Sequence, residues 1–369
     1  MLIGIVKEIK DKENRVSLTP DGAKKLAESG NEVLIEIDAG FNSGFSNEDY
    51  KKANAKIVSA EEAWNTELVM KVKEPLEQEY KFLKNNIIFT YFHLAGVTKT
   101  LTDALLKNKT TAIAYETVED SYNRLPLLAP MSAVAGNIAV QMGAYYLAKF
   151  NNGKGTMIGE VLGNFYGKVV IIGDGVVGRH VAKTAYAMGG HVYLFGRHEE
   201  RMDNLREFIG RKSHILLSTP ENISEHIKDA DLVVGAVLLP GAKAPHVVTE
   251  EMVKTMQPGS VIVDVSIDQG GCIETSRPTT HSNPVFTKYG VTHYCVTNMP
   301  GAYPRTSTIA LTNATLPYAL KLSKEGLSIM KKDKGFAKGV NTYNGFITYK
   351  PVAEALNMMN KFKELNELI

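Results

Sequence analysis

The sequence predicts an α/β protein with two doubly wound sheets of mostly parallel strands. Three observations lead to this fold class: short apolar runs alternate with polar, helix-like stretches, a break with two prolines near residue 128 divides that series, and the second series opens on a glycine-rich turn. Alternating strands and helices pack as a parallel sheet with helices on its faces. Since 369 residues exceed the usual size of one domain, we expect two domains.

The first series predicts an α/β layer that ends near residue 128. Its strand candidates are short apolar runs, and its helix candidates are the polar stretches between them. The expected strands are 4–6, 33–37, 68–72, 87–91 and 112–114, and the expected helices are 21–29, 47–54 and 99–108.

A segment with two prolines separates the two series. Pro126 and Pro130 break the chain, and Ser132 can cap a helix that we expect to run to residue 150. The stretch 151–167 holds five glycines and is expected to be a loop. A further capped helix is expected after Tyr303. The expected strands of the second series are 169–172, 192–195, 215–217, 232–234 and 261–265.

The charge balance and the cysteine content exclude several function classes. There are 42 Lys and Arg against 40 Asp and Glu, so a net charge of +2 gives no electrostatic footprint for nucleic acid or an anionic membrane. Neither a signal peptide nor a membrane-spanning run is evident, so we expect a cytoplasmic protein. Cys272 and Cys295 form no CxxC pair and have no histidine at ligand spacing, so we expect no metal site, no disulfide and two packed thiols.

The glycine-rich turn is the clearest single motif. Gly173, Gly175 and Gly178 fit the GxGxxG fingerprint between an apolar strand and an amphipathic helix, and a second strand closes the unit. The first glycine permits a tight turn, the second lets a pyrophosphate approach the backbone, and the third lets the helix pack against the strand. The alternative is a glycine-rich turn without a ligand, but the strand–turn–helix context favours a dinucleotide site.

The position that usually holds the adenosine ribose carries no acid in this chain. The second strand is followed by Gly196 and Arg197, whereas an Asp or Glu there usually binds the ribose hydroxyls of NAD. Arg197, with Arg201 one helical turn away, could pair with a 2′-phosphate. We therefore expect ready use of NADP. The alternative is that backbone groups hold the ribose and that NAD is used.

Several longer stretches resemble the alanine dehydrogenase family, which also includes the transhydrogenase alpha subunit. Together they cover both expected domains nearly end to end. They are GIVKEIKDKENRVSLTP (4–20), LVMKVKEP (68–75), YFHLAG (91–96), LAPMSAVAGNIAVQMGAYYL (128–147), VDVSIDQGGCIETSRPTTHSNP (263–284) and HYCVTNMPGAYPRTSTIALTNATLPYALKL (293–322).

The resemblance implies both an architecture and a reaction. It implies two Rossmann-like domains: a substrate domain from residues 1–128 and 306–369, and a dinucleotide-binding domain from residues 129–305 inserted in it. It implies that L-alanine, water and an oxidised nicotinamide cofactor, NAD or NADP, are converted reversibly to pyruvate, ammonium and the reduced cofactor. It also implies a homo-oligomer, commonly a hexamer.

Three residues of the first domain are candidates for substrate chemistry. The resemblance implies that Arg15 holds the substrate carboxylate, that Lys73 binds the carbonyl oxygen, and that His93 is the general acid or base. The alternatives are a surface arginine, a charged residue at a strand end, and a buried structural histidine. Lys71 lies two residues before Lys73, and spacing alone does not choose between them.

The second domain supplies the remaining candidates. Asp268 follows a strand, where open α/β sheets bind their ligands, and it is expected to help bind or polarise the substrate or water. Its alternative is an Asx-turn before two glycines. Ser132, Asn298 and Met299 resemble cofactor contacts, with a helix cap, a turn residue and a core methionine as alternatives. Ala133 and Asn137 depart from the charged residues that similar proteins often carry there.

Three function classes remain open at this point. The first is an L-alanine dehydrogenase. The second is a related amino-acid or opine dehydrogenase of the same architecture, because pocket size discriminates poorly between small substrates. The third is a non-catalytic, transhydrogenase-like nucleotide-binding module, which would not need Arg15, Lys73, His93 and Asp268 together.

Overall fold

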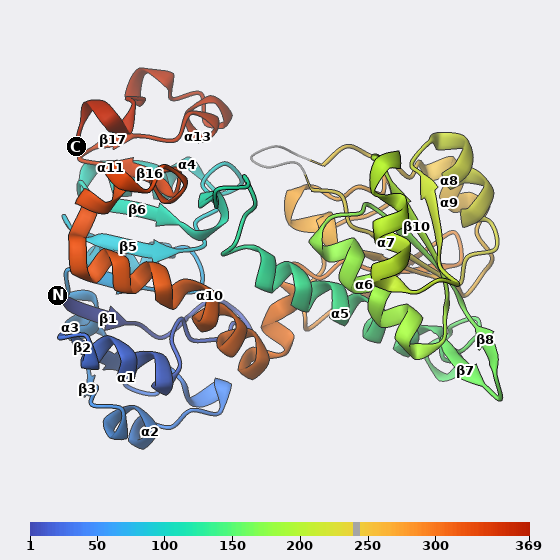
Figure 1. The fold of residues 1–369 in the computed structure, drawn as a ribbon, viewed down its shortest axis with the longest axis horizontal. Helices are drawn as coiled ribbons and strands as arrows, with labels where there is room; N and C mark the ends of the chain where they lie inside the picture. The colour runs from blue at the N-terminus through green and yellow to red at the C-terminus, as the bar shows by residue number, and fades with distance from the viewer. Residues whose placement is uncertain (239–243) are drawn as a thin grey trace. The chain divides into compact units, whose positions relative to one another are not determined.

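The computed structural model describes residues 1–238 and 244–369 and divides into two compact units (Figure 1). Unit 1 consists of Met1–Met131 and Gly301–Ile369, and unit 2 of Ser132–Pro300. The division falls inside one helix, α5 (Ala129–Leu147). Each unit has its own sheet and is described by itself.

Unit 1 is built on an eight-stranded sheet. The six strands from the N-terminal part of the chain are all parallel and lie in the order β3-β2-β1-β4-β5-β6, and the late strand β16 joins β6 in antiparallel orientation and pairs with β17. This order reverses direction between β1 and β4, as in a doubly wound sheet. The strands are β1 (Leu2–Ile5), β2 (Glu32–Glu36), β3 (Lys56–Val58), β4 (Leu68–Met70), β5 (Ile87–Thr90), β6 (Thr111–Ala114), β16 (Val340–Tyr343) and β17 (Phe346–Ile347).

The helices of unit 1 form where the sequence supplies caps and apolar faces. Thr19 accepts a hydrogen bond from the Gly22 amide at the start of α1, and Pro20 occupies the first turn, where its missing N–H costs nothing. Leu101 and Leu105 of α4 pack into a core with strand residues of the sheet. The helices are α1 (Pro20–Glu28), α2 (Asn47–Lys52), α3 (Ala60–Trp64), α4 (Lys99–Lys107), α10 (Pro304–Glu325), α11 (Ile329–Lys332), α12 (Lys334–Ala337) and α13 (Lys350–Ala355).

Unit 2 repeats the order of the first five strands of unit 1 in a seven-stranded sheet. Its strands lie in the order β11-β10-β9-β12-β13-β15-β14, and only β14 is antiparallel to its neighbour. A separate hairpin, β7 (Gly159–Val161) and β8 (Asn164–Tyr166), stands outside this sheet. The sheet strands are β9 (Lys168–Ile172), β10 (His191–Gly196), β11 (His214–Leu217), β12 (Leu232–Gly235), β13 (Val261–Asp264), β14 (Val285–Lys288) and β15 (Val291–Tyr294).

Helices cover both faces of the sheet in unit 2. Val169 and Ile171 of β9 pack in a core with residues of α5 and α6, and the alternate residues Val170 and Ile172 pack in a second core with residues of α8. This alternation follows from the two-residue period of a strand. The remaining helices are α6 (Val176–Met188), α7 (Met202–Ile209), α8 (Pro220–Ile227) and α9 (Glu250–Lys254).

The predicted fold class is confirmed, and two local predictions need correction. Helix α5 begins at Ala129, so Ser132 lies inside the helix and is not its cap. The helix can begin before Pro130, because the backbone N–H groups of a first helical turn have no partner within the helix and proline lacks only such a group. The expected loop 151–167 contains the β7–β8 hairpin, whose turn places Leu162 and Gly163 at positive φ. The antiparallel strands β14, β16 and β17 and the parallel strands β3 and β15 were not predicted.

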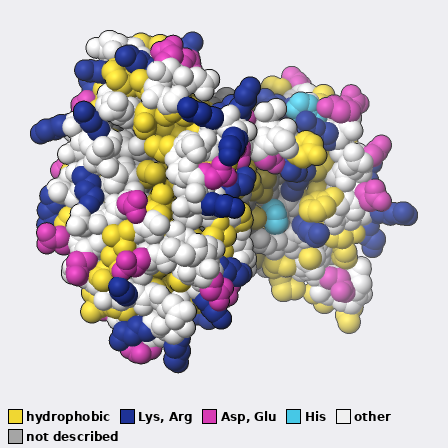
Figure 2. All heavy atoms as spheres, turned by 60° about the vertical axis from the view of Figure 1, so that its left-hand side comes forward, with side chains coloured by type: hydrophobic (Ala, Val, Ile, Leu, Met, Phe, Trp, Pro, Cys, Tyr) yellow, Lys and Arg dark blue, Asp and Glu magenta, His cyan; other side chains and the backbone are white. Residues whose placement is uncertain are grey.

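The surface of the protein carries charges of both signs. Figure 2 shows Lys and Arg side chains interspersed with Asp and Glu over the face drawn, in keeping with the net charge of +2. Cys272 and Cys295 are both buried and unpaired, as expected for packed thiols. Within the described ranges, no helix is both long and apolar enough to cross a membrane.

Candidate active site

The substrate candidates of unit 1 follow the carboxyl ends of three adjacent strands. Arg15 lies in the loop after β1, Lys73 comes after β4, and His93 comes after β5. The chain crosses in opposite directions from β1 and β4, and ligands of open α/β sheets bind outside the carboxyl ends of the strands at such a switch point. The topology therefore brings these three residues to the edge of the sheet where a ligand is expected.

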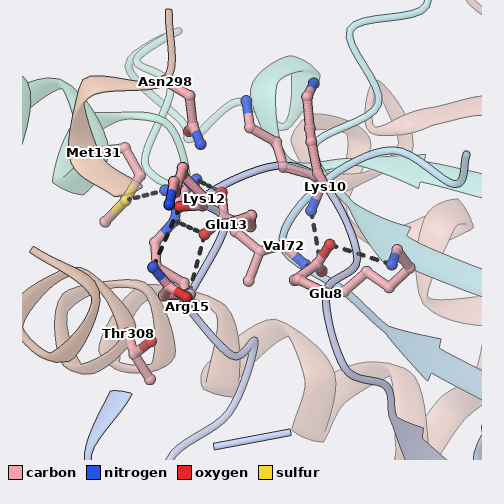
Figure 3. A network of polar contacts seen from close by, with 12 residues as sticks. Glu8, Lys10, Lys12, Glu13, Arg15, Val72, Met131, Asn298 and Thr308 are labelled. Carbon is pink, nitrogen blue, oxygen red and sulfur yellow. Dashed lines mark hydrogen bonds and ion pairs between the residues drawn. The ribbon is translucent and has the colours of Figure 1, made fainter. Parts of the chain in front are cut away.

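Arg15 is a buried residue, so the alternative of a surface arginine is wrong. Its side chain is 2% exposed, and its Nε and one terminal nitrogen donate to the two carboxylate oxygens of Glu13 at 2.7 and 2.6 Å (Figure 3). The other terminal nitrogen lies 3.2 Å from the sulfur of Met131. Burial alone would lower the pKa of Arg15, but the ion pair with Glu13 raises it, so the guanidinium stays charged.

Helix α10 fixes the loop that carries Arg15. The hydroxyl of Thr308 accepts the Val16 amide at 3.1 Å, and the hydroxyl of Thr312 accepts the Thr19 amide at 3.0 Å. Both threonines are buried, so these bonds form away from water, where an unpaired amide would be costly. The N-terminal and C-terminal segments of unit 1 thus contact each other at this loop.

The structure distinguishes the two lysines that the sequence spacing left open. Lys71 is 1% exposed, and its ammonium contacts Glu79 at 2.8 Å and Glu8 at 3.2 Å. Lys73 is 8% exposed, and its ammonium has no ion pair or side-chain hydrogen bond among the described residues. Lys71 is therefore committed to a buried ion-pair network, whereas the charge of Lys73 is available to a ligand.

The backbone of Lys73 is held from both sides. Glu8 accepts the amides of Val72 and Lys73 at 2.6 and 3.3 Å, and the hydroxyl of Thr90 donates to the carbonyl oxygen of Lys73 at 3.0 Å. Burial raises the pKa of Glu8, and the charge of Lys71 opposes that rise. The buried Glu8–Lys71–Glu79 network therefore positions Lys73 without contacting its ammonium.

His93 has a left-handed backbone, with φ of 48°, which is uncommon outside glycine. Burial, followed by the charges of Lys73, Lys10 and Arg15, lowers its pKa to about 3. Its side chain keeps 39% of its surface exposed. His93 is thus a neutral imidazole near neutral pH that remains accessible for proton exchange.

Glu116 supports His93, and the sequence reasoning missed it. Its carboxylate accepts the amides of Phe92 and His93 at 3.3 and 2.6 Å, and one oxygen lies 4.0 Å from Nδ1 of His93. Burial raises the pKa of Glu116 to about 7 although these backbone bonds lower it. Glu116 follows β6, so the carboxyl-end rule that the sequence analysis applied to Asp268 would have found it.

The glycine-rich turn of unit 2 has the shape that a dinucleotide requires. A Cβ added at Gly178 would lie 1.8 Å from the Gly173 carbonyl oxygen, and Gly173 itself has φ of 114°, so neither position admits another residue without strain. A Cβ at Gly175 would meet nothing within 4 Å. Gly175 is the N-cap of α6, where free N–H groups and the helix dipole attract an anion. The turn therefore fits a pyrophosphate.

Asp268 lies with Asn298 at the carboxyl ends of β13 and β15. It is exposed on the 3₁₀ segment Val265–Gln269, and one carboxylate oxygen accepts the Asn298 amide at 3.4 Å. Asp264, the last residue of β13, is buried and accepts the amides of Ser266, Cys272 and Ile273, which is a structural role.

The other candidates of unit 2 differ in exposure. Met299 is 2% exposed and packs in the core shared with α5 and α6, while Ser132 is half-buried on α5. Arg197 and Arg201 are exposed, with no ion pair among the described residues. No group of three or more His, Cys, Asp or Glu in the described ranges is placed to hold a metal ion.

Comparison with known families accounts for nearly the whole chain. Residues 4–135 match the N-terminal domain of the family described as alanine dehydrogenase/PNT, and residues 139–350 match its C-terminal domain. The chain belongs to the alanine dehydrogenase/PNT family. The recognition from sequence stretches is thereby confirmed.

Individual members of the family are similar over their full length. An alanine dehydrogenase of Staphylococcus saprophyticus is 51% identical, with 97% of each chain covered. The alanine dehydrogenase 2 of Staphylococcus aureus is 49% identical, with 100% of each covered. A solved structure of an L-alanine dehydrogenase has a TM-score of 0.92 at 46% identity, and the match covers 97% of this chain and 99% of that one.

Proposed function

We propose that this chain is an L-alanine dehydrogenase, an enzyme that converts L-alanine and water reversibly to pyruvate and ammonium. The observation that carries the proposal is the set of Arg15, Lys73 and His93 at the carboxyl ends of three adjacent parallel strands. Relatives named alanine dehydrogenase, about half identical over the full chain, support it. Unit 1 is the proposed substrate domain and unit 2 the proposed dinucleotide-binding domain.

Two cations of unit 1 would hold the 2-oxo acid. Arg15 would pair with the substrate carboxylate through its charged guanidinium, whose planar fork matches that group. The ammonium of Lys73 would bind the carbonyl oxygen and stabilise negative charge that develops on it. Both side chains are largely buried, so these charges act in a medium of lower dielectric than water.

Proton transfer falls to His93 and Asp268 in this proposal. After alanine loses hydride from Cα and a proton from nitrogen, water adds to the resulting imine, and ammonium leaves as the carbonyl forms. His93 is a neutral and accessible imidazole, so one ring nitrogen has a lone pair that can take the proton of the attacking water. Asp268 would orient that water or the substrate amine through its exposed carboxylate.

The glycine-rich turn would hold the pyrophosphate of the nicotinamide cofactor at the N-terminus of α6. The chemistry that the bound cofactor supplies is acceptance of the hydride from Cα. Ser132, Asn298 and Met299 are proposed contacts of the nicotinamide half of the cofactor. The sequence predicted NADP use through Arg197 and Arg201, and a comparison of NADH with NADPH decides between the two cofactors.

We further propose a homohexamer, as the family resemblance implies. Exposed apolar side chains on and beside the β7–β8 hairpin support an interface between copies. They are Phe150, Met157, Val161, Leu162 and Tyr166, with Leu162 94% exposed. Light scattering of the purified chain measures the oligomer mass. A cytoplasmic location stays a prediction from the sequence.

The proposed activity is tested by following absorbance at 340 nm with pyruvate and ammonium, with NADH and NADPH in parallel. Oxidation that requires ammonium supports the proposal. Oxidation that requires a second amino acid in place of ammonium would indicate an opine dehydrogenase instead. Tight nucleotide binding without any turnover would indicate the non-catalytic module.

A further inference from the structure

The carboxylate of Asp174 lies where the acid of a usual NAD site would lie. Asp174 stands between the first two glycines of the turn after β9, and Gly196 ends the neighbouring strand β10. A Cβ added at Gly196 would fall 3.1 Å from both Cγ and Oδ2 of Asp174. The side chain of Asp174 therefore reaches from one strand end to the next and occupies the space left by the missing side chain at Gly196.

One oxygen of this carboxylate is buried and has no partner among the described residues. Oδ2 of Asp174 is without a hydrogen bond there, although it is shielded from solvent. Arg179 donates its Nε–H to the backbone carbonyl of Asp174 at 2.9 Å, which fixes the backbone and leaves the carboxylate unpaired by that arginine. A buried acceptor without a donor is costly, so such an atom in a native site points to a ligand that supplies the donor.

We propose that Asp174 accepts the ribose hydroxyls of the adenosine half of the cofactor, and so selects NAD over NADP. This inference rests on the proposed dinucleotide site. In most NAD enzymes the corresponding acid stands at the end of the second strand, which is position 196 here. The chain places its acid on the first turn instead, and Gly196 is the residue that makes room for it.

The charges near this position act in opposite directions on a 2′-phosphate. The carboxylate of Asp174 would repel a group that carries about −1.5 to −2 charge, while Arg197 and Arg201 would attract it. The carboxylate oxygen is buried and both arginines are exposed, so solvent and salt screen the attraction more than the repulsion. The balance therefore favours a free 2′-hydroxyl.

Binding of two fragments without the nicotinamide ring tests the inference independently of catalysis. Calorimetry on the full chain compares ADP-ribose with 2′-phospho-ADP-ribose. We expect the unaltered chain to bind ADP-ribose more tightly, and D174N to weaken ADP-ribose roughly ten- to a hundredfold, the range for hydrogen bonds to a charged group. D203N, which removes an exposed acid on α7, is the matched control and should change neither affinity.

A swap of the two positions is the sharper experiment. Gly196→Asp alone would bring two carboxylates into contact, so it should weaken ADP-ribose binding, whereas Asp174→Gly combined with Gly196→Asp should restore it. Thermal melting checks that each variant folds, and the double variant answers the question if the single one does not fold. Unchanged affinities in D174N, or a gain in ADP-ribose affinity from Gly196→Asp alone, would overturn the role of Asp174. Failure of the unaltered chain to bind either fragment would overturn the dinucleotide site itself.

Discussion

The two units share the order of their first five strands, but the turn that leaves the first strand has a different composition in each. After β1 the loop carries buried charged side chains, with Arg15 paired to Glu13 and Glu8 paired to Lys71. After β9 the turn carries glycines and presents the N–H groups of a helix N-terminus. The topology thus sets where a ligand binds, and the composition of the loop sets which ligand it is.

The two units also differ in how a substitution near the site would affect stability and ligand binding. In unit 1 the residues that hold the loop and the residues proposed to bind substrate are charged and lie beside one another, so breaking one buried pair leaves an uncompensated charge. In unit 2 the backbone itself is the proposed ligand-binding group. Substitutions at neighbouring positions should therefore have distinguishable effects on folding and on binding.

The largest expected effect is the loss of proton transfer, with one proposed group from each unit. His93→Ala and Asp268→Ala should each lower turnover with pyruvate and ammonium roughly 10²- to 10⁴-fold, because general acid–base catalysis contributes that much. Steady-state rates at 340 nm measure the loss, and circular dichroism checks the fold. Near-normal turnover in either variant would remove that residue from the mechanism.

A matched pair of lysines tests the distinction between positioning and binding in unit 1. Lys71→Met should cost about 3–5 kcal/mol of stability, because it leaves Glu8 and Glu79 buried without their cation. Lys73→Met should leave stability nearly unchanged and abolish most activity. Urea denaturation and initial rates separate the two effects. Equal losses of stability in both variants would contradict the assignment.

Arg15→Lys keeps the charge of the site but removes the planar fork. We expect the pyruvate Michaelis constant to rise roughly ten- to a hundredfold, since a lysine cannot reproduce a two-pronged contact with a carboxylate. The substitution also weakens the pair with Glu13, so a denaturation curve accompanies the kinetics. An unchanged Michaelis constant would place Arg15 outside the substrate contacts.

A pair of glycines tests the same distinction in unit 2. Gly178→Ala should cost about 1–3 kcal/mol by overpacking, because its Cβ would collide with the Gly173 carbonyl. Gly175→Ala should leave the melting temperature unchanged, because its Cβ meets open space, and should weaken ADP-ribose binding. The glycine assignments would be wrong if Gly175→Ala lowered the melting temperature and spared the binding.

A further expected effect is a change in the pH dependence of stability at Glu116. Its pKa is raised from 4.5 to about 7 in the folded chain, so its contribution to stability is present below pH 4.5 and is lost as the pH rises to about 7. Relative to the unaltered chain, Glu116→Gln should therefore gain stability across this window, at up to about 1.4 kcal/mol per pH unit. Urea midpoints at pH 4.5, 6 and 7.5 measure it.

His93 has the opposite dependence, which provides a check on the Glu116 measurement. Its pKa is lowered from 6.5 to about 3, so the folded chain gains stability from this group as the pH rises from about 3 to 6.5. In the combined variant His93→Ala with Glu116→Gln, both slopes should vanish. A pH-independent difference between Glu116→Gln and the unaltered chain would show that Glu116 titrates normally.

The fold could be predicted from local sequence patterns, whereas the details of the site depend on contacts between residues that are far apart in the sequence. The structure from β9 through the glycines to α6 can be predicted from consecutive residues, because the strand, the turn and the helix each have a local sequence pattern. The choice of Lys73 over Lys71 needed the partners of both, which come from distant segments. Likewise, Asp174 and Gly196 can be read from the sequence, but only the pairing of β9 with β10 shows that the side chain of Asp174 lies beside Gly196.

The two misread segments near α5 have different physical causes. Pro130 suggested a break, but a proline in the first helical turn lacks only an N–H that has no partner there. The β7–β8 hairpin was obscured by its glycines, yet its Leu162–Gly163 turn is a two-residue connection at positive φ, which matches the twist of antiparallel strands. Neither strand is an apolar run, since β7 reads GEV and β8 reads NFY, so the usual strand pattern is missing from the sequence.

The division of unit 1 between two distant segments has a consequence for how the chain matures during synthesis. Val16 and Thr308, which hydrogen-bond to each other, are 292 residues apart, and β6 gains its second neighbour only when β16 has been made. Unit 2 is one uninterrupted segment, so its sheet can close while the ribosome is still translating the C-terminal part of unit 1. The first residues to be made are therefore among the last to reach their final surroundings, and the Arg15 loop is completed only after α10 emerges.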